Sequence, residues 1–303
     1  MSLPVTTPLM QAPAKAIHVR EHAGATLESN EAYGLYLLFD AACHPDGLKA
    51  AQDYVARTGS AIHNLLDGLP EGDESEVGCY LMAIQPDHAE DVFAYWADPD
   101  RQPAAVWLWS IDSASGLAAH LRRFVLVKHR PNESGLLRFA DPHVWRALTV
   151  ELEESVGQML SAPFGAWWIA DLDGGWQTTR PLRRSMVIPA SPIVLTEQRV
   201  AKLEDAMWPV QIYFALYPEP DGQPVTGSRM ARLETIREEY ARAKEWGGRD
   251  AQDYVMFSGL ADEFGTEFDA SPVIRAPLQA GKEQRQKLAN TLRSIAPSAW
   301  EKV

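Results

Sequence analysis

The chain has 303 residues, of which 46% are hydrophobic and 23% are charged, with 41 acidic residues against 28 basic ones. This composition excludes a disordered, collagen-like or disulfide-stapled chain, and the length suggests about two domains. The net charge of −13 provides no general attraction to phosphates, so nucleic acid is not an expected partner. Protein or small-molecule partners are expected instead.

The cysteines and the first residues bear on where the protein works. Cys43 and Cys79 are too few, and too far from a second ligand pair, for a zinc knuckle or a CxxC redox pair. We expect them to be buried thiols in a reducing compartment. The start of the chain lacks the apolar core of a secretory signal, and no apolar run reaches the roughly 18 residues of a membrane span. These features predict a cytoplasmic protein that engages no membrane.

The first half of the chain alternates strand and helix patterns. A near-continuous apolar run from Tyr33, YGLYLLFDAA, is typical of a buried strand, and residues 46–58 carry a helical stripe. Further strands are predicted at 78–84, 106–110 and 136–140, with helices at 86–97 and around 117–124. This order favours an α/β fold with a mixed, partly parallel sheet flanked by helices, and α+β is the alternative.

Asp141 and Pro142 predict the start of a helix. Aspartate at the N-cap accepts hydrogen bonds from first-turn N–H groups, and proline at the first helical position lacks only a donor that would be unpaired. Apolar residues then recur at helical spacing over about 18 residues, which predicts one long helix. They are Trp145, Leu148, Leu152, Val156 and Met159.

Beyond this helix, residues 166–184 predict a hairpin that turns at Asp173-Gly174, and residues 185–196 look like a linker. The rest is predicted to be mostly helical, and the paired glycines Gly247 and Gly248 are a helix-stop signal. We therefore expect three parts. They are an N-terminal extension at 1–30, an α/β domain at 31–190 and a helical lobe at 191–303.

Two short motifs suggest metal chemistry. His18, Glu21 and His22 match the H-x-x-E-H pattern, in which two histidines one helical turn apart bind zinc and the glutamate activates water. The flanking residues offer little support for a rigid site, so an exposed polar segment is favoured over a metal-dependent hydrolase. The D-x-D of Asp171 and Asp173 precedes two glycines, and a turn explains it better than a bound cation. No cofactor is expected.

Arginines and tryptophans form two further groups. The arginines are predicted to pair with carboxylates and to position a helix against the sheet, rather than to bind a ligand. The tryptophans are predicted to pack mainly in the core, and any that are exposed are candidate partner contacts. The arginines are Arg122, Arg123, Arg138 and Arg146, and the tryptophans are Trp107, Trp109, Trp167, Trp168 and Trp176.

The order of the segments resembles the domain of unknown function 4123 family, the adaptor chaperones of type VI secretion effectors. The opening strand with Asp40, the runs GCYLMAI and VWLWS, and the helix LAAHLRRFVLV match the family's order. The block LLRFADPHVWRAL is similar to the family's F-R-F-Y-D-P-R-V-L, from which Ala140 and His143 depart. Its matching residues are Arg138, Phe139, Asp141, Pro142 and Val144.

This resemblance implies a non-catalytic adaptor that binds a secreted toxin in the donor cell and promotes its loading onto the VgrG spike. We assign a structural motif to Asp40, Arg122, Arg123, Arg138, Phe139, Asp141, Pro142 and Arg146, of which Arg146 comes from the arginine group and not from the resemblance. Two alternatives remain open, which are the metal-dependent hydrolase on His18, Glu21 and His22 and a cytoplasmic immunity-type protein that binds a toxin.

Overall fold

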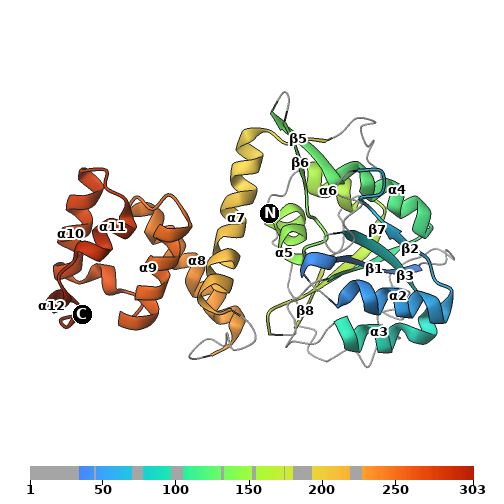
Figure 1. The fold of residues 1–303 in the computed structure, drawn as a ribbon, viewed down its shortest axis with the longest axis horizontal. Helices are drawn as coiled ribbons and strands as arrows, with labels where there is room; N and C mark the ends of the chain where they lie inside the picture. Colours follow the sequence, from blue (N-terminus) through green and yellow to red (C-terminus); the bar gives the residue numbers. More distant parts are fainter. Residues whose placement is uncertain are drawn as a thin grey trace, which may run out of the picture. The chain divides into compact units, whose positions relative to one another are not determined.

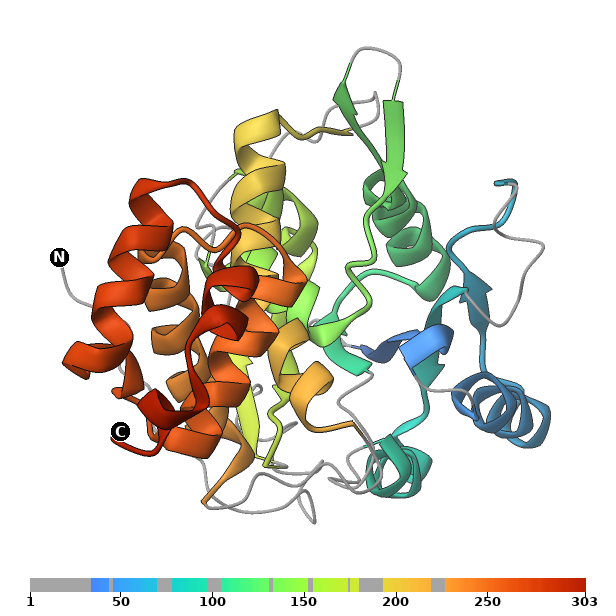
Figure 2. The same cartoon turned by 60° about the vertical axis from the view of Figure 1, so that its left-hand side comes forward.

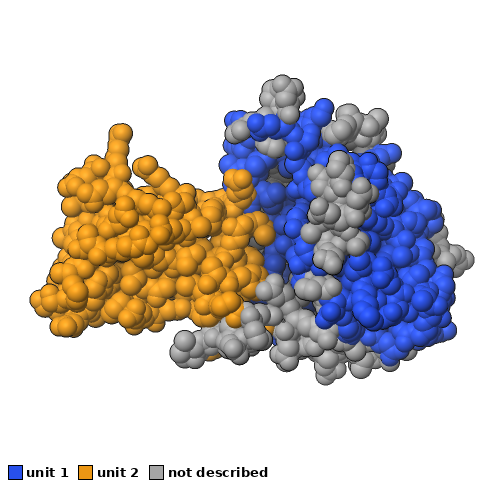
Figure 3. Space-filling view, in the orientation of Figure 1, with its two compact units in different colours: residues 1–203 blue, residues 204–303 orange. Residues whose placement is uncertain are grey.

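The computed structural model describes residues 34–43, 46–69, 78–96, 105–130, 133–151, 155–173, 175–179, 193–218 and 227–303. The contacts within the chain divide it into two compact units, residues 1–203 and 204–303, coloured separately in Figure 3. The dividing point falls inside helix α7 (Glu197–Leu216). Within the described ranges, no helix combines the length and the apolar character needed to cross a membrane.

The first unit is built on a six-stranded sheet with the strand order β2-β3-β1-β4-β7-β8 (Figure 1). Its strands are β1 (Gly34–Asp40), β2 (Ile62–Asn64), β3 (Cys79–Ile84), β4 (Ala105–Ser110), β7 (Phe164–Ala170) and β8 (Trp176–Thr179). All neighbouring strands in this sheet pair antiparallel. The prediction of a sheet flanked by helices is confirmed, whereas the parallel pairing expected among these strands is wrong.

The order of the strands in the sheet explains why the prediction of parallel pairing is wrong. Helix α2 (Gly47–Thr58) connects β1 to β2, while the 3-10 turn η4 (Pro86–His88) and helix α3 (Ala89–Trp96) connect β3 to β4. Each connected pair runs in one direction, as strand–helix–strand alternation predicts. However, β3 lies between β1 and β2, and β1 lies between β3 and β4. The two crossovers therefore produce an antiparallel sheet within this unit, which we call the α/β unit.

Helices cover both faces of the sheet (Figure 1). Leu37 and Leu38 of β1 are both fully buried, although successive strand residues point to opposite faces. Leu38 packs in a core with Phe124 of α4 (Ala114–Val125), whereas Leu37 packs in a second core with Tyr54 and Trp96 from α2 and α3. Burial on both faces accounts for the near-continuous apolar run of β1.

The helix predicted from Asp141 onward is not one helix. It consists of α5 (Pro142–Arg146), a π-helical turn η5 (Ala147–Glu151) and α6 (Ser155–Ser161), with residues 152–154 outside the described ranges. In a continuous helix, residues nine apart are separated by roughly 13.5 Å. Here a side chain added at Gly157 would place its Cβ 2.0 Å from the carbonyl oxygen of Leu148. The backbones of α6 and η5 therefore approach too closely for any residue but glycine.

A small sheet with the order β6-β5-β9 completes the first unit. It contains β5 (Leu126–Arg130), β6 (Glu133–Leu136) and β9 (Ile193–Val194). The predicted strand at 136–140 shares only Leu136 with β6, since Phe139 and Ala140 lie in a turn. The β5–β9 pair is parallel. Strand β9 falls within the predicted linker, whose residues 185–192 lie outside the described part of the chain.

The hairpin predicted at 166–184 is confirmed as the antiparallel pair β7–β8. The Oδ1 atom of Asp171 accepts hydrogen bonds from the backbone N–H groups of Asp173 at 3.0 Å and Gly175 at 2.7 Å. This carboxylate therefore serves the turn, as the glycines after the D-x-D motif predict.

The second unit is helical, as predicted (Figure 2). After the end of α7 it contains α8 (Arg229–Glu245), α9 (Ala251–Phe264), a 3-10 turn η6 (Phe268–Ala270), α10 (Pro272–Glu283), α11 (Leu288–Ser294) and α12 (Pro297–Trp300). Gly247 adopts a φ of +90° just after α8, a backbone conformation that favours glycine and ends the helix. Ile236, Phe257 and Phe268 lie in its buried core.

Candidate functional site

The end of β1 and the segment before α5 meet in an ion pair. Nε of Arg138 donates to Oδ2 of Asp40 at 2.8 Å, and Nη2 donates to Oδ1 at 2.5 Å. The Asp40 side chain is 2% exposed, whereas that of Arg138 is 47% exposed. Oδ1 of Asp40 also accepts from the backbone N–H of Ala42 at 3.0 Å. The hydrogen bond to Asp40 raises the pKa of Arg138, so the guanidinium stays charged.

Both cysteines lie next to this pair. Cys79 sits opposite Asp40 in the β1–β3 register, and Cys43 ends the 3-10 turn η1 (Ala41–Cys43) that follows β1. Burial, followed by the charges of Asp141 and Asp40, raises the pKa of Cys43 to about 12. Burial raises the pKa of Cys79 well above its ordinary value. Both thiols are therefore protonated at neutral pH. Only the deprotonated thiolate is an effective nucleophile or metal ligand, so neither cysteine is poised for such a role.

Asp141 caps helix α5, as the sequence predicts. Its Oδ1 atom accepts from the backbone N–H of His143 at 2.8 Å, and Pro142 occupies the start of the helix. Phe139 is fully buried in the core between the sheet and α4, while Arg146 is half-buried on α5. The Asp-Pro block therefore anchors the start of α5 beside the Asp40–Arg138 pair.

The arginines do not all gather at one place. Nη2 of Arg122 on α4 donates to the carbonyl oxygen of Asn64 at 2.8 Å and to Oδ2 of Asp67 at 3.0 Å. This pair ties α4 to the end of β2, whereas Arg138 binds Asp40 at the end of β1. Arg123 is exposed on α4. The predicted joining of helix to sheet thus occurs through two separate ion pairs.

Most of the tryptophans are core residues. Trp107, Trp109 and Trp167 are 1%, 7% and 2% exposed. The prediction that these tryptophans pack mainly in the core is confirmed for these three, and their burial leaves them little surface for contact with a partner. Trp168 is half-buried and packs edge-on against Trp109, with 6.4 Å between ring centroids. Trp176 belongs to β8, and its side chain lies outside the described part of the structure.

The predicted zinc motif of His18, Glu21 and His22 lies outside the described residues. Within the ranges that the structure describes, no group of three or more histidine, cysteine, aspartate or glutamate side chains is arranged to hold a metal ion.

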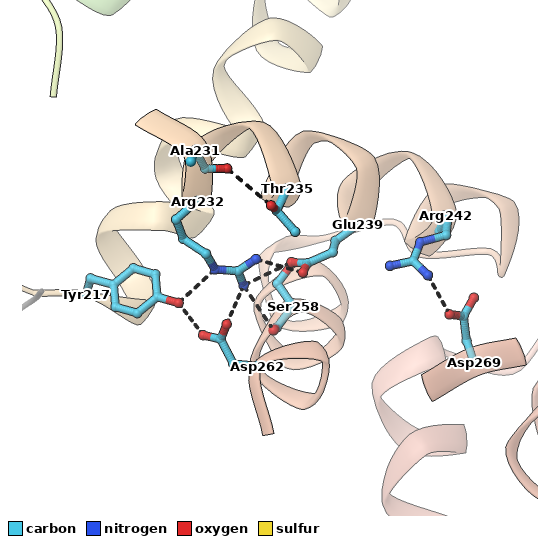
Figure 4. Close-up of polar contacts among 9 residues, drawn as sticks. All are labelled: Tyr217, Ala231, Arg232, Thr235, Glu239, Arg242, Ser258, Asp262 and Asp269. Atoms are coloured by element: carbon cyan, nitrogen blue, oxygen red, sulfur yellow. Dashed lines mark hydrogen bonds and ion pairs between the residues drawn. The ribbon is translucent and has the colours of Figure 1, made fainter. Parts of the chain in front are cut away.

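A second polar site, which the sequence patterns did not predict, lies inside the helical unit (Figure 4). Arg232 of α8 donates through Nη1 and Nη2 to the two carboxylate oxygens of Glu239, at 2.7 and 3.1 Å. Its Nε donates to the hydroxyl of Tyr217 at 2.8 Å, and Nη2 lies 2.9 Å from Oδ1 of Asp262. The Tyr217 hydroxyl in turn donates to Oδ2 of Asp262. We call these four residues the Arg232 cluster.

Burial governs the electrostatics of the Arg232 cluster. It raises the pKa of Glu239, and Asp262 adds to this effect, whereas Arg232 opposes it. Burial, together with the hydrogen bond to Asp262, raises the pKa of Tyr217 to about 12. Burial alone would lower the pKa of Arg232, but its bonds to Glu239 and Tyr217 outweigh that and raise it. Arg232 and Glu239 are seven residues apart, which places them two turns apart on one helix face.

Two buried aspartates fix other parts of this unit. Asp253 of α9 accepts from the backbone N–H groups of Arg249 at 3.0 Å and Ala289 at 2.8 Å, so it joins α9 to the start of α11. Asp269 of η6 accepts from Nη1 of Arg242 and from the indole N–H of Trp246, both at 2.8 Å. Each carboxylate thus holds together segments that are distant along the chain.

The first unit is therefore a helix-covered antiparallel sheet whose Asp40–Arg138 pair adjoins a capped helix start. Residues 35–157, from β1 into α6, match the family model described as Domain of unknown function (DUF4123). This region of the chain matches that family, and residues 158–303 lie outside the match. Comparison with curated proteins and with solved structures gave no significant match.

Proposed function

We propose that this protein is a cytoplasmic adaptor that binds a type VI secretion effector and promotes its loading onto the VgrG spike, without chemistry of its own. The observation that carries the proposal is the DUF4123 domain at residues 35–157, because the family that the segment order resembles consists of such adaptors. Asp40, Arg138 and Asp141 of the matched blocks lie together in this domain.

The chemistry of this site supports a role in binding rather than in a reaction. The carboxylate of Asp40 is neutralised by Arg138, and that of Asp141 caps a helix. The raised pKa values of Cys43 and Cys79 keep both thiols protonated. These groups stabilise the junction of β1 with α5, so we assign them to maintaining the shape of the domain.

The proposed mechanism is reversible masking of an apolar effector segment. Candidate contacts are the half-buried Trp168, Trp176, and apolar faces of the C-terminal helices. The net charge of −13 would keep the complex soluble and steer a basic partner toward it.

Co-expression with any candidate effector whose gene neighbours the gene of this chain tests the proposal. We expect a stable complex on co-purification, a higher effector level, and recovery of the effector with the VgrG spike. An effector whose abundance and spike association are the same with and without this chain would contradict the adaptor role. An unrelated effector, co-expressed in parallel, serves as the control for general chaperone effects.

Metal analysis separates the adaptor from the hydrolase alternative. The purified chain is expected to contain no stoichiometric zinc. Zinc bound at one equivalent, and lost in the double variant His18→Ala and His22→Ala, would instead favour the hydrolase.

A further inference from the structure

The Arg232 cluster places two carboxylates on one guanidinium (Figure 4). The side chains of Glu239 and Arg232 are 0% and 9% exposed, whereas that of Asp262 is 32% exposed. Glu239 holds both Nη atoms, and Asp262 contacts Nη2 as well. One positive charge is thus shared by two negative charges in a site that water reaches mainly from the side of Asp262.

This arrangement leaves the buried carboxylate with an incomplete counter-charge. A charge held out of water without a full partner is costly, and taking up a proton is the usual way in which a carboxyl group avoids that cost. We propose that Glu239 is a proton-binding site of the helical unit, which fills on mild acidification and strengthens the packing of α8, α9 and the end of α7. This inference is independent of the proposed adaptor function.

The groups around Glu239 come from three segments. Arg232 lies on α8 itself, Asp262 and Ser258 come from α9, and Tyr217 follows α7 and reaches the site through Arg232. Of these, Arg232 and Ser258 favour the charged carboxylate, whereas burial and Asp262 favour the protonated form.

A neighbouring ion pair on the same helix lies apart from this cluster. Arg242 lies about one turn beyond Glu239 on α8 and pairs with Asp269 of η6. Figure 4 shows this pair apart from the Arg232 cluster. The contacts of Arg242 therefore provide a nearby charge pair that protonation of Glu239 leaves in place.

The direction of the pH effect follows from linkage. Burial raises the pKa of Glu239 above its ordinary value of 4.5, so the folded unit binds this proton more tightly than the unfolded chain. The resulting stability is fully present below pH 4.5 and is lost as pH rises through the folded-state pKa. Protonation of Glu239 should therefore add stability to the helical unit as pH falls from neutrality toward 4.5. Asp205 and Asp250, whose pKa values are lowered from 3.8, act in the opposite direction only at lower pH.

Proton-uptake titration of the full chain tests the proposal. On acidification, the wild type should take up one more proton per chain than Glu239→Gln. This additional proton should bind in a single step with its midpoint above pH 4.5. In Asp262→Asn the step should move to lower pH, because Arg232 then serves Glu239 alone. Glu238→Gln changes the exposed neighbouring glutamate and should leave the step in place.

Two results would overturn the proposal. One is a midpoint at or below pH 4.5 for the proton uptake that depends on Glu239. The other is a midpoint that stays the same in Asp262→Asn. If Glu239→Gln fails to fold, carbon NMR of the glutamate carboxyl groups in the wild-type chain gives the same information. A carboxyl signal should then titrate above pH 4.5 and move in Asp262→Asn, and the lack of such a signal would reject the site.

Discussion

The two units bury charge in different ways. In the α/β unit, the sheet is packed between apolar cores, and the ion pair of Asp40 and Arg138 lies at the end of a strand with its guanidinium half-exposed. In the helical unit, Arg232 and Glu239 are both enclosed. Backbone hydrogen bonds and side-chain alternation fix the register of a sheet, whereas helices must be aligned by their side chains. The buried polar contacts of the helical unit supply that alignment.

Helix α8 illustrates the point. Its sequence, RMARLETIREEYARAKE, carries charges around most of its circumference, so its apolar stripe is narrow. Leu233 and Ile236 are buried, but such a stripe allows the helix to rotate or slide against its neighbours. The bidentate contact between Arg232 and Glu239, extended to Asp262 of α9, defines one arrangement.

The largest expected effect is in the apolar core of the α/β unit. Trp107→Ala removes a side chain that is 1% exposed, and we expect a loss of about 3 to 5 kcal/mol in the free energy of unfolding, measured by denaturant titration. Trp168→Ala, on the neighbouring strand, should cost less because Trp168 is half-buried. Equal losses for the two variants would contradict the assignment of Trp107 to the core.

In the helical unit, the largest effect should come from removing the buried cation. Arg232→Met leaves Glu239 enclosed without its partner, and we expect a loss of about 3 kcal/mol. The double variant Arg232→Met and Glu239→Leu replaces the pair by apolar side chains and should recover much of that stability. Hydrogen exchange of α8 and α9 provides the measurement. A double variant as unstable as the single one would show that the polar contacts themselves are required.

Breaking the ion pair of the α/β unit should cost less in the free energy of unfolding, because the Arg138 side chain is half-exposed to water. Asp40→Asn removes a charged acceptor from two hydrogen bonds of Arg138, and the expected loss is about 2 kcal/mol. A double-mutant cycle with Arg138→Gln isolates the pair. Asp53→Asn, which removes the exposed partner of Lys49, should change the stability too little to measure. A coupling energy near zero for Asp40 and Arg138 would show that this pair does not stabilise the junction of β1 with α5.

Local patterns predicted the parts of the structure that depend on nearby residues. The cap at Asp141 and Pro142, the turn at Asp171 and the end of α8 at Gly247 each follow from a few neighbouring residues. The π-helical turn at 147–151 was missed because the apolar spacing continues through it, while the close approach of Gly157 to Leu148 depends on tertiary packing.

Long-range pairing was harder to predict. The partner of Arg138 is Asp40, 98 residues earlier, and only the interleaved strand order brings the two together. In the same way, a charged stripe on α8 indicates a solvated face, so nothing local distinguishes Arg232 and Glu239 from exposed neighbours such as Glu238. Their partners Tyr217 and Asp262 come from other helices. Tertiary contacts, rather than helix propensity, decide which charges are enclosed.

The smallest expected effect is a pH dependence in the α/β unit that opposes that of the helical unit. His120 of α4 donates from Nε2 to the carbonyl oxygen of Leu160 at 2.9 Å and lies edge-on to Phe164, with 6.3 Å between ring centroids. Burial lowers its pKa below the ordinary value of 6.5. The unfolded chain therefore binds this proton more tightly, so stability from neutral His120 is present above pH 6.5 and is lost as pH falls through the folded-state pKa.

Acidification should therefore loosen α4 while it stabilises α8 and α9. Hydrogen exchange at several pH values, corrected for the intrinsic exchange rate, reports on the two units separately. His120→Phe retains a ring beside Phe164 but removes the titrating group, so the protection of α4 should become less dependent on pH below 6.5. Glu239→Gln should leave the response of α4 unchanged. If His120→Phe keeps the wild-type pH dependence at α4, some other group must be responsible for it.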